Sequence, residues 1–254
     1  MFIRRIYVEG YKSIRALALE LGQVNVFIGR NGAGKSTLLE ACAWGKAQVE
    51  TDKNDGLHPL PPLTVFSPVY RDLCRPFDFG PRGTLDEYGE GLLSWLRGLP
   101  REEPAAWAAI VRAVRDIESL SSLDFNLESG RLQVRTIGEG GLHVLFYLFI
   151  VISTRMPRLF AVENLHAPLS PSLSRGLTRI MVEGIIAGDK QALLMTHNPF
   201  VLDGMDLQDE RQRLFVVSRD SEQNIVVRRV QPAIRGAELP MRLSDAFERT
   251  LLGE

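Results

Sequence analysis

One short segment restricts the fold of this chain more than any other. Residues 29–36 read Gly-Arg-Asn-Gly-Ala-Gly-Lys-Ser and match the pattern G-x-x-x-x-G-K-[ST] at every position. The segment lies between an apolar run, VNVFI at 24–28, and a stretch of helix-forming residues, STLLEACAWGKA at 36–47. A buried strand, a glycine-rich turn and a helix in this order form a phosphate-binding loop, because backbone N–H groups and the helix N-terminus point at the anion.

The residue types of this loop predict how it contacts a nucleotide. Lys35 supplies an ammonium for the β- and γ-phosphates, and Ser36 supplies a hydroxyl for Mg²⁺. We therefore expect ATP and Mg²⁺ as ligands. The expected phosphate-binding residues are Gly29, Arg30, Asn31, Gly32, Ala33, Gly34, Lys35, Ser36 and Thr37.

Length and composition favour one α/β domain in the cytoplasm. The chain has 254 residues, a net charge of -1 and 45% hydrophobic residues, which argues against a disordered protein and gives no overall attraction for nucleic acid or acidic membranes. Its most apolar run, 142–152, has 11 residues, whereas a membrane-spanning helix needs roughly 18. No secretory leader is recognised, and Cys42 and Cys74 are too few for a disulfide framework or a zinc site.

The hydrophobic pattern along the chain predicts a parallel sheet that includes the strands at 159–162 and 192–195, and the run at 24–28 reads as a buried central strand. Strand, helix and strand in sequence indicate such a sheet, and the first 28 residues read as strands. Further along we expect an irregular proline-rich excursion at 49–81, helices at 92–120, a hairpin at 123–136, a buried helix at 142–154, strands at 159–162 and 192–195 around a helix at 172–186, a hairpin at 213–230 and a helix at 243–252.

An acidic residue ends one of these strands. LFAV at 159–162 is followed by Glu163, and a Walker B strand places an acid in this way beside the phosphate-binding loop to hold the metal. We expect Glu163 to bind Mg²⁺ together with Ser36; the alternative is an ordinary acid at a strand end. The next residue is Asn164, whose amide cannot accept a proton at neutral pH.

Three segments together resemble the ABC-type ATPase heads of the SMC, RecF and OLD-like group, including small ATPases of bacterial defence modules. These segments are IRRIYVEGYKSIRALALELGQVNVFIGRNGAGKSTLLEA, VENLHAPLSP and LLMTHNPFVLDG, and the resemblance covers about 1–47 and 137–218. It implies an α/β fold: a P-loop NTPase head with an N-terminal antiparallel β lobe, a parallel core sheet and an inserted, mainly helical lobe. It also implies one domain over 1–254, with the insertion at about 48–136.

The resemblance assigns roles to residues outside the loop. His197 stands where the family places a histidine facing the γ-phosphate, and Asn164 stands where the family has the glutamate that polarises the attacking water. The segment from Ile137 to Gly141 takes the place of the signature, which contacts the γ-phosphate bound by the opposing protomer. Gly138 replaces its usual serine, and no glutamine is assigned to the Q-loop. The resemblance thus implies contacts from Gly138, Glu139, Gly140 and Gly141 and catalytic roles for Lys35, Glu163, Asn164 and His197.

The resemblance further implies an ATP-operated switch. Two copies would dimerise around Mg·ATP and drive or gate a separate effector or nuclease that acts on nucleic acid, in antiphage defence, without contacting a membrane. Two alternatives stay open: a scaffold that binds ATP without hydrolysing it, motivated by Asn164, and a nucleotide-binding subunit of an ABC transporter. DNA or RNA contact through seven arginines within 211–242 is a further hypothesis, because an exposed hairpin edge explains these charges equally well.

Overall fold

The computed structural model describes residues 1–254 except 55, 75–84, 118–137, 166–168, 232–241 and 250–254. Its centre is a sheet with the strand order β10-β9-β3-β8-β7-β6, in which β10 is antiparallel to β9 and all other neighbouring strands are parallel. The strands are β3 (Val24–Ile28), β6 (Thr64–Phe66), β7 (Leu159–Val162), β8 (Gln191–Thr196), β9 (Gln212–Arg219) and β10 (Ile225–Arg229). The expected parallel core and closing hairpin are thus present.

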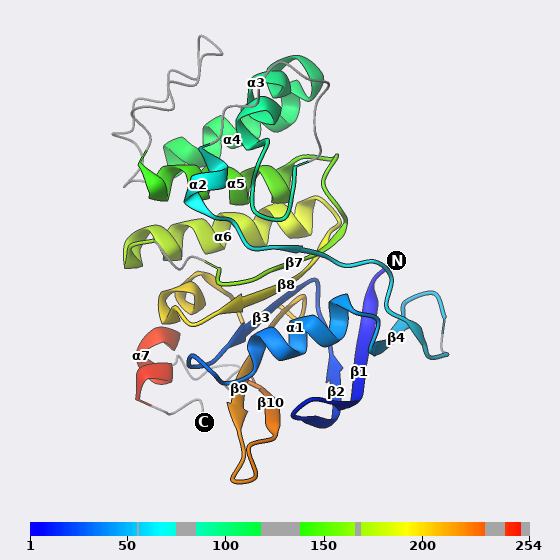
Figure 1. Ribbon diagram of the computed structural model, residues 1–254. Helices are drawn as coiled ribbons and strands as arrows, with labels where there is room; N and C mark the ends of the chain where they lie inside the picture. Colours follow the sequence, from blue (N-terminus) through cyan, green and yellow to red (C-terminus); the bar gives the residue numbers. More distant parts are fainter. Residues whose placement is uncertain (55, 75–84, 118–137, 166–168, 232–241, 250–254) are drawn as a thin grey trace.

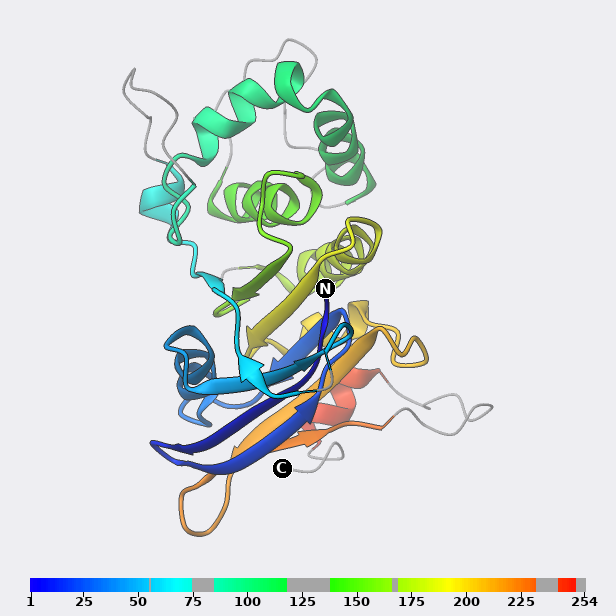
Figure 2. The same ribbon diagram turned by 90° about the vertical axis from the view of Figure 1, so that its right-hand side faces the viewer.

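A second, antiparallel sheet forms the N-terminal lobe, in the order β2-β1-β4-β5. Its strands are β1 (Ile3–Tyr11), β2 (Ile14–Glu20), β4 (Ala47–Thr51) and β5 (His58–Pro59). Figure 2 shows this sheet in blue and cyan beside the strands of the core sheet.

The stretch after α1 (Lys35–Ala43) differs from the sequence prediction. The helix expected to reach Ala47 ends at Ala43, because Gly45 adopts a φ of 69° and Ala47 begins β4. The expectation of an irregular excursion from Val49 is wrong for three strands of this stretch. β4 and β5 belong to the N-terminal sheet, and β6 is the edge strand of the core sheet. The alternating burial of Ala47, Val49 and Thr51 explains the pairing of β4 with β1.

Helices cover the core sheet on both faces (Figure 1). They are α2 (Tyr70–Leu73), α3 (Leu92–Glu102), α4 (Pro104–Asp116), α5 (Glu139–Ile152), α6 (Pro171–Ala187), the 3-10 helix η3 (Pro199–Gly204) and α7 (Leu243–Glu248), together with α1. One hydrophobic core lies between one face of the sheet and the helices α3, α4, α5, α6 and η3. A second hydrophobic core lies between the other face of the sheet, α1 and the N-terminal lobe. Figure 1 shows α5 and α6 between the sheet and the outer helices α3 and α4.

Helix α5 is enclosed almost completely. Every residue from Leu142 to Val151 is buried, which agrees with the all-apolar pattern of the expected helix. Among the described residues, no helix is long and apolar enough to cross a bilayer. The hairpin expected at 123–136 lies outside the described residues.

Candidate nucleotide-binding site

The glycine-rich loop connects β3 to α1, as its sequence predicts. Gly32 and Gly34 adopt φ values of 81° and 110°, in the region that side chains other than glycine rarely occupy. Gly29 lies against β9, where a Cβ would come within 2.3 Å of the carbonyl oxygen of Val217. Gly32 and Gly34 are therefore required by their backbone conformation, and Gly29 is required by the close approach of β9.

Lys35 lies at the start of α1 with its ammonium folded over the loop. Its Nζ donates hydrogen bonds to the carbonyl oxygens of Gly29 (2.7 Å) and Arg30 (3.0 Å), and the residue is 8% exposed. Burial lowers the pKa of the Lys35 ammonium, and the nearby Glu163 carboxylate acts in the opposite direction. The positive charge thus lies where a phosphate bound to the loop would neutralise it.

Ser36 and Glu163 meet across the end of the sheet. The Ser36 hydroxyl donates a 2.5 Å hydrogen bond to Glu163 Oε1, although the two residues are 127 positions apart. Glu163 follows β7, and its N–H donates to the carbonyl oxygen of Phe66 at 2.8 Å, which ties it to the end of β6. A hydroxyl and a carboxylate are oxygen ligands that suit Mg²⁺, which takes its other ligands from phosphates and water. The pair therefore fits the metal of a nucleotide complex.

The parallel strands bring the candidate residues to one edge of the sheet, where ligands of open α/β sheets bind. The phosphate-binding loop follows β3, Glu163 follows β7 and His197 follows β8. Sequence reasoning missed Ser67, which follows β6 and lines a cavity of about 640 Å³ together with Ser36 and Glu163. The strand before it has only three residues, Thr64–Phe66, so its sequence gave little signal.

Hydrogen bonds join the segments that follow β7 and β8. Asn164 is exposed and adopts a φ of 52°, a conformation that asparagine tolerates better than most residues. Thr196 Oγ1 donates to the carbonyl oxygen of Leu165 (3.0 Å) and accepts from the N–H of Asn198 (3.0 Å). The side chain of His197, between these residues, is exposed. Thr196 thus joins the backbone that follows β7 to the backbone that follows β8, next to Asn164 and His197.

The signature-like residues begin helix α5. Gly138 is the N-cap of α5, and Glu139, Gly140 and Gly141 form its first turn, so the expectation of a turn before a helix starting at Leu142 is wrong by three residues. None of the four lines the cavity that contains Ser36 and Glu163. Ile137 lies outside the described residues. A contact from this segment to nucleotide bound by a second copy of the chain remains an expectation from the resemblance.

Three of the seven arginines of the expected nucleic-acid patch form ion pairs within the chain. Arg211 pairs with the aspartate two residues before it at 2.8 Å, and Arg213 and Arg229 both lie within 4 Å of Glu20, at 3.1 and 3.8 Å. Arg235 lies outside the described residues. Paired guanidinium groups leave less charge for a phosphate backbone, which weakens the nucleic-acid hypothesis.

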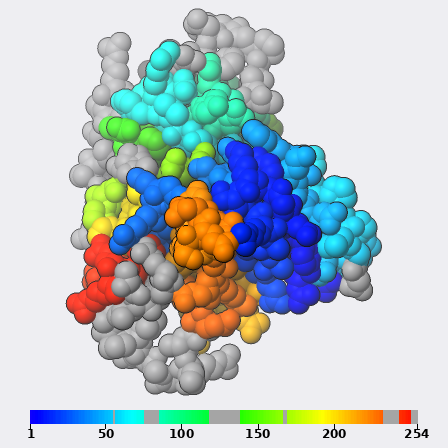
Figure 3. Space-filling model, turned by 60° about the horizontal axis from the view of Figure 1, so that its bottom comes forward, coloured from blue at the N-terminus to red at the C-terminus, as the bar shows by residue number. Residues whose placement is uncertain are grey.

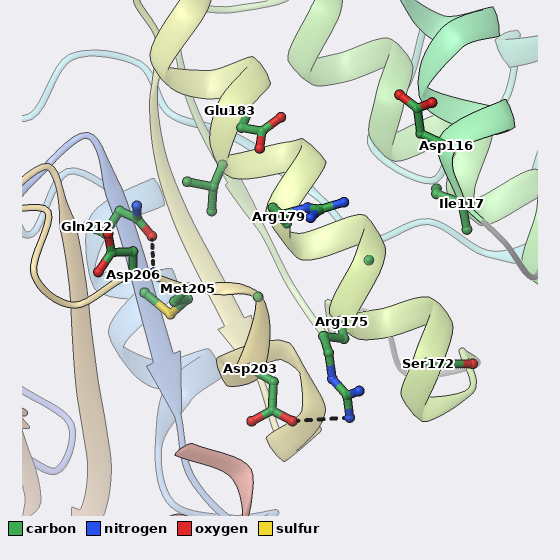
Figure 4. Close-up of a pocket in the computed structure, with 13 residues that line it drawn as sticks. Asp116, Ile117, Ser172, Arg175, Arg179, Glu183, Asp203, Met205, Asp206 and Gln212 are labelled. Carbon is green, nitrogen blue, oxygen red and sulfur yellow. Dashed lines mark hydrogen bonds and ion pairs between the residues drawn. The ribbon is translucent and has the colours of Figure 1, made fainter. Parts of the chain in front are cut away.

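A larger cavity, of about 880 Å³, lies between α6, η3 and the end of α4 (Figure 4). Asp203 stands at one side of it, with side-chain exposure of only 4%, and lies 3.4 Å from the guanidinium of Arg175. Asp203 also accepts hydrogen bonds from the N–H and hydroxyl of Ser244, at 3.0 and 2.9 Å. The Asp203 carboxylate thus joins α6, η3 and α7. The cavity beside it is lined by none of the predicted site residues.

Comparison with known proteins supports the fold. Residues 1–43 match the family described as AAA ATPase domain, whereas no curated protein sequence matches the chain. The SMC head domain from Thermotoga maritima superposes with a TM-score of 0.51 and 14% identity, over 91% of this chain and 100% of that one. The fold is that of an ATPase head.

Two structures of transporter components share this architecture. The cbiO1 protein of Clostridium perfringens, part of the ABC transporter complex cbiONQ, gives a TM-score of 0.53 at 14% identity, over 89% of this chain and 88% of that one. The ADP conformation of MJ1267, an ATP-binding cassette of an ABC transporter, gives 0.50 at 18% identity, over 90% and 91%. At such identities the similarity concerns the ATPase-head fold alone.

Proposed function

We propose that the chain is an ATPase head that binds Mg·ATP and hydrolyses it as a switch for a partner protein. The observation that carries the proposal is the contact of Ser36 with Glu163 beside the buried ammonium of Lys35. A cation for the phosphates and two oxygen ligands for the metal converge at the end of β3, and the AAA ATPase match over 1–43 supports the same assignment.

Each part of the site has a distinct task in this proposal. The N–H groups of Gly32 to Thr37 bind the phosphates, and Lys35 exchanges its bonds to loop carbonyls for bonds to the β- and γ-phosphates. Ser36 and Glu163 hold Mg²⁺, which supplies neutralisation of the charge that develops on the phosphates. The proposal assigns His197, which is exposed after β8, to a contact with the γ-phosphate.

Hydrolysis is expected to be slow because of Asn164. Its amide can orient a water molecule but cannot take the proton from it, so catalysis depends on positioning and on the electrostatics of Lys35 and the metal. A stable ATP-held clamp is the second candidate function, and Asn164 is the observation that favours it.

Dimerisation and the partner complete the proposal. From the resemblance of the signature-like segment, the first turn of α5, from Gly138 to Gly141, would contact the γ-phosphate bound by a second copy. We further propose, from the resemblance of the motifs to defence ATPases, that the dimer gates an effector or nuclease in antiphage defence. Service as a transporter subunit is the alternative, supported by the architecture of cbiO1 and MJ1267.

The experiment compares ATP turnover and molar mass for the wild type and for Lys35→Ala, Asn164→Glu and Asn164→Asp. Phosphate release is measured with and without Mg²⁺, and mass is measured by light scattering with and without ATP. The aspartate variant is included because Asn164 has a positive φ, which glutamate adopts less readily. Turnover that requires Lys35 and Mg²⁺, with ATP-dependent doubling of mass, supports the switch.

Other outcomes separate the two candidates. ATP binding without turnover, with turnover appearing in either acidic variant, supports the clamp. If wild type and Lys35→Ala bind ATP equally, the assignment of the nucleotide site is wrong.

A further inference from the structure

One arginine outside the predicted site is bonded directly to the phosphate-binding loop. Arg219 is the last residue of β9, and its Nε donates to the carbonyl oxygen of Gly32 at 2.8 Å. One of its terminal nitrogens donates to the carbonyl oxygen of Gln223 (2.7 Å) and contacts the hydroxyl of Ser13 at 3.3 Å. A single guanidinium therefore joins the loop, the β9–β10 turn and the β1–β2 turn.

Backbone and side-chain contacts bring the same three segments together independently of Arg219. The N–H of Ile225 donates to the carbonyl oxygen of Ser13 at 2.8 Å. The side chain of Ile225 lies so close to Gly34 that a Cβ on the glycine would be 2.4 Å from Ile225 Cδ1. Figure 3 shows the hairpin in orange between two blue regions of the N-terminal part of the chain. The hairpin thus forms a wall of the loop.

The bond to Gly32 fixes one particular peptide unit. The carbonyl of Gly32 is held by Arg219, and the N–H of Ala33, on the opposite side of the same planar peptide, donates to the carbonyl oxygen of Arg30 at 3.1 Å. Hydrogen bonds at both ends restrain the rotation of this peptide. Because Gly32 has no Cβ to limit its backbone, the restraint depends on these two hydrogen bonds, one from within the loop and one from Arg219 outside it.

We propose that Arg219 is a positioning residue for nucleotide binding: it orients the Gly32–Ala33 peptide and couples the phosphate-binding loop to the turns at Ser13 and Gln223. The proposal rests on the proposed function, since it assigns nucleotide affinity as the consequence. A preorganised loop binds phosphate without first losing conformational freedom. The planar fork of arginine suits three oxygen acceptors in different directions, which a lysine ammonium on a flexible stem matches less well.

The test compares Arg219→Ala and Arg219→Lys with Arg15→Ala. Arg15 is the matched control because it forms an ion pair with Glu222 in the same hairpin turn, and no hydrogen bond described for it reaches the loop. We expect Arg219→Ala to raise the Kd for Mg·ATP about tenfold, which corresponds to about 1.4 kcal/mol. Arg219→Lys should raise Kd about threefold, and Arg15→Ala should leave it unchanged. Turnover at saturating ATP should stay within twofold of wild type, because the residue acts on binding.

A second readout does not require ATP. In nucleotide-free protein, hydrogen exchange at the Ala33 amide should be at least tenfold faster in Arg219→Ala and unaltered in Arg15→Ala. If wild type does not bind ATP, the proposed function fails, and the exchange rates still decide whether Arg219 orients the loop. Two outcomes would overturn the inference: an unchanged exchange rate and Kd in Arg219→Ala, or equal changes of both in Arg15→Ala. If Arg219→Ala does not fold, the same comparison is made with Arg219→Lys.

Discussion

Lys190 provides a stability prediction that can be worked through quantitatively. The residue directly precedes β8, is 3% exposed, and donates from Nζ to the carbonyl oxygens of Ile150 (2.7 Å) and Ser153 (2.8 Å) at the end of α5. Burial lowers the pKa of this ammonium from 10.5 to about 8, with partial opposition from the Glu103 carboxylate. We therefore expect the contribution of Lys190 to stability to depend on pH.

The sign follows from the protons bound in each state. Between pH 8 and 10.5 the unfolded chain keeps the Lys190 proton while the folded protein releases it, so the free energy of unfolding rises with pH. Below pH 8 both states are protonated and the contribution is constant. Since one pKa unit corresponds to about 1.4 kcal/mol, the rise over the whole window amounts to about 3 kcal/mol.

The assay compares wild type with Lys190→Met by urea unfolding at intervals from pH 7 to 10.5. The quantity to compare is the difference in free energy of unfolding between the two proteins, because a second group titrates in the same range. Burial raises the pKa of the Cys42 thiol from 9.0 to about 12, which lowers the free energy of unfolding of both proteins as the pH rises above 9. At pH 7 the methionine variant should be less stable by about 1–3 kcal/mol, because two carbonyl groups lose their donor.

The stability difference should then widen by about 3 kcal/mol up to pH 10.5. A constant or shrinking difference above pH 8 would refute the reasoning, since it would show that the two carbonyl bonds keep the folded-state amine protonated.

Three further substitutions test other parts of the structure. Gly34→Ala should abolish nucleotide binding in calorimetric titrations and cost about 1–3 kcal/mol of stability, because its φ of 110° disfavours a side chain and Ile225 fills the space; normal affinity would contradict this. Thr196→Val removes the hydroxyl that joins the ends of β7 and β8, so turnover should fall several-fold with Kd unchanged, and equal turnover would show that this bond does not position the site. Asp203→Ala leaves Ser244 without its acceptor and should cost about 3 kcal/mol in urea unfolding; a loss within experimental error would mean that α7 docks by apolar contacts alone.

The parts of the fold that could be predicted are those encoded in contiguous residues. The loop at 29–36 and the strand and helix around it form a local unit, and the continuous apolar run at 142–152 identifies α5. The convergence of Ser36 and Glu163 also agrees with expectation, because the two residues follow β3 and β7, which are parallel strands on either side of β8. The roles of these residues remain predictions.

The missed features depend on contacts that are distant in sequence. The pattern of β4 is only five residues long and its partner, β1, lies about forty positions earlier, so the sequence alone favours a helix end and a loop at this place. Lys190 follows Gly188 and Asp189 in what reads as an exposed turn, but the folded chain buries it against the end of α5, where Nζ finds its two acceptors. Arg219 reads as one of many hairpin arginines until the turn brings its acceptors together.

The enclosure of α5 has a mechanical consequence. The helix has 14 residues and is therefore about 21 Å long. It is exposed only at its first turn, near Glu139, and it is held at its far end by Lys190. A densely packed interior transmits strain instead of absorbing it. A force applied to the exposed turn would therefore displace α5 as a rigid rod, together with the helices around it, and deliver the motion to the opposite side of the domain.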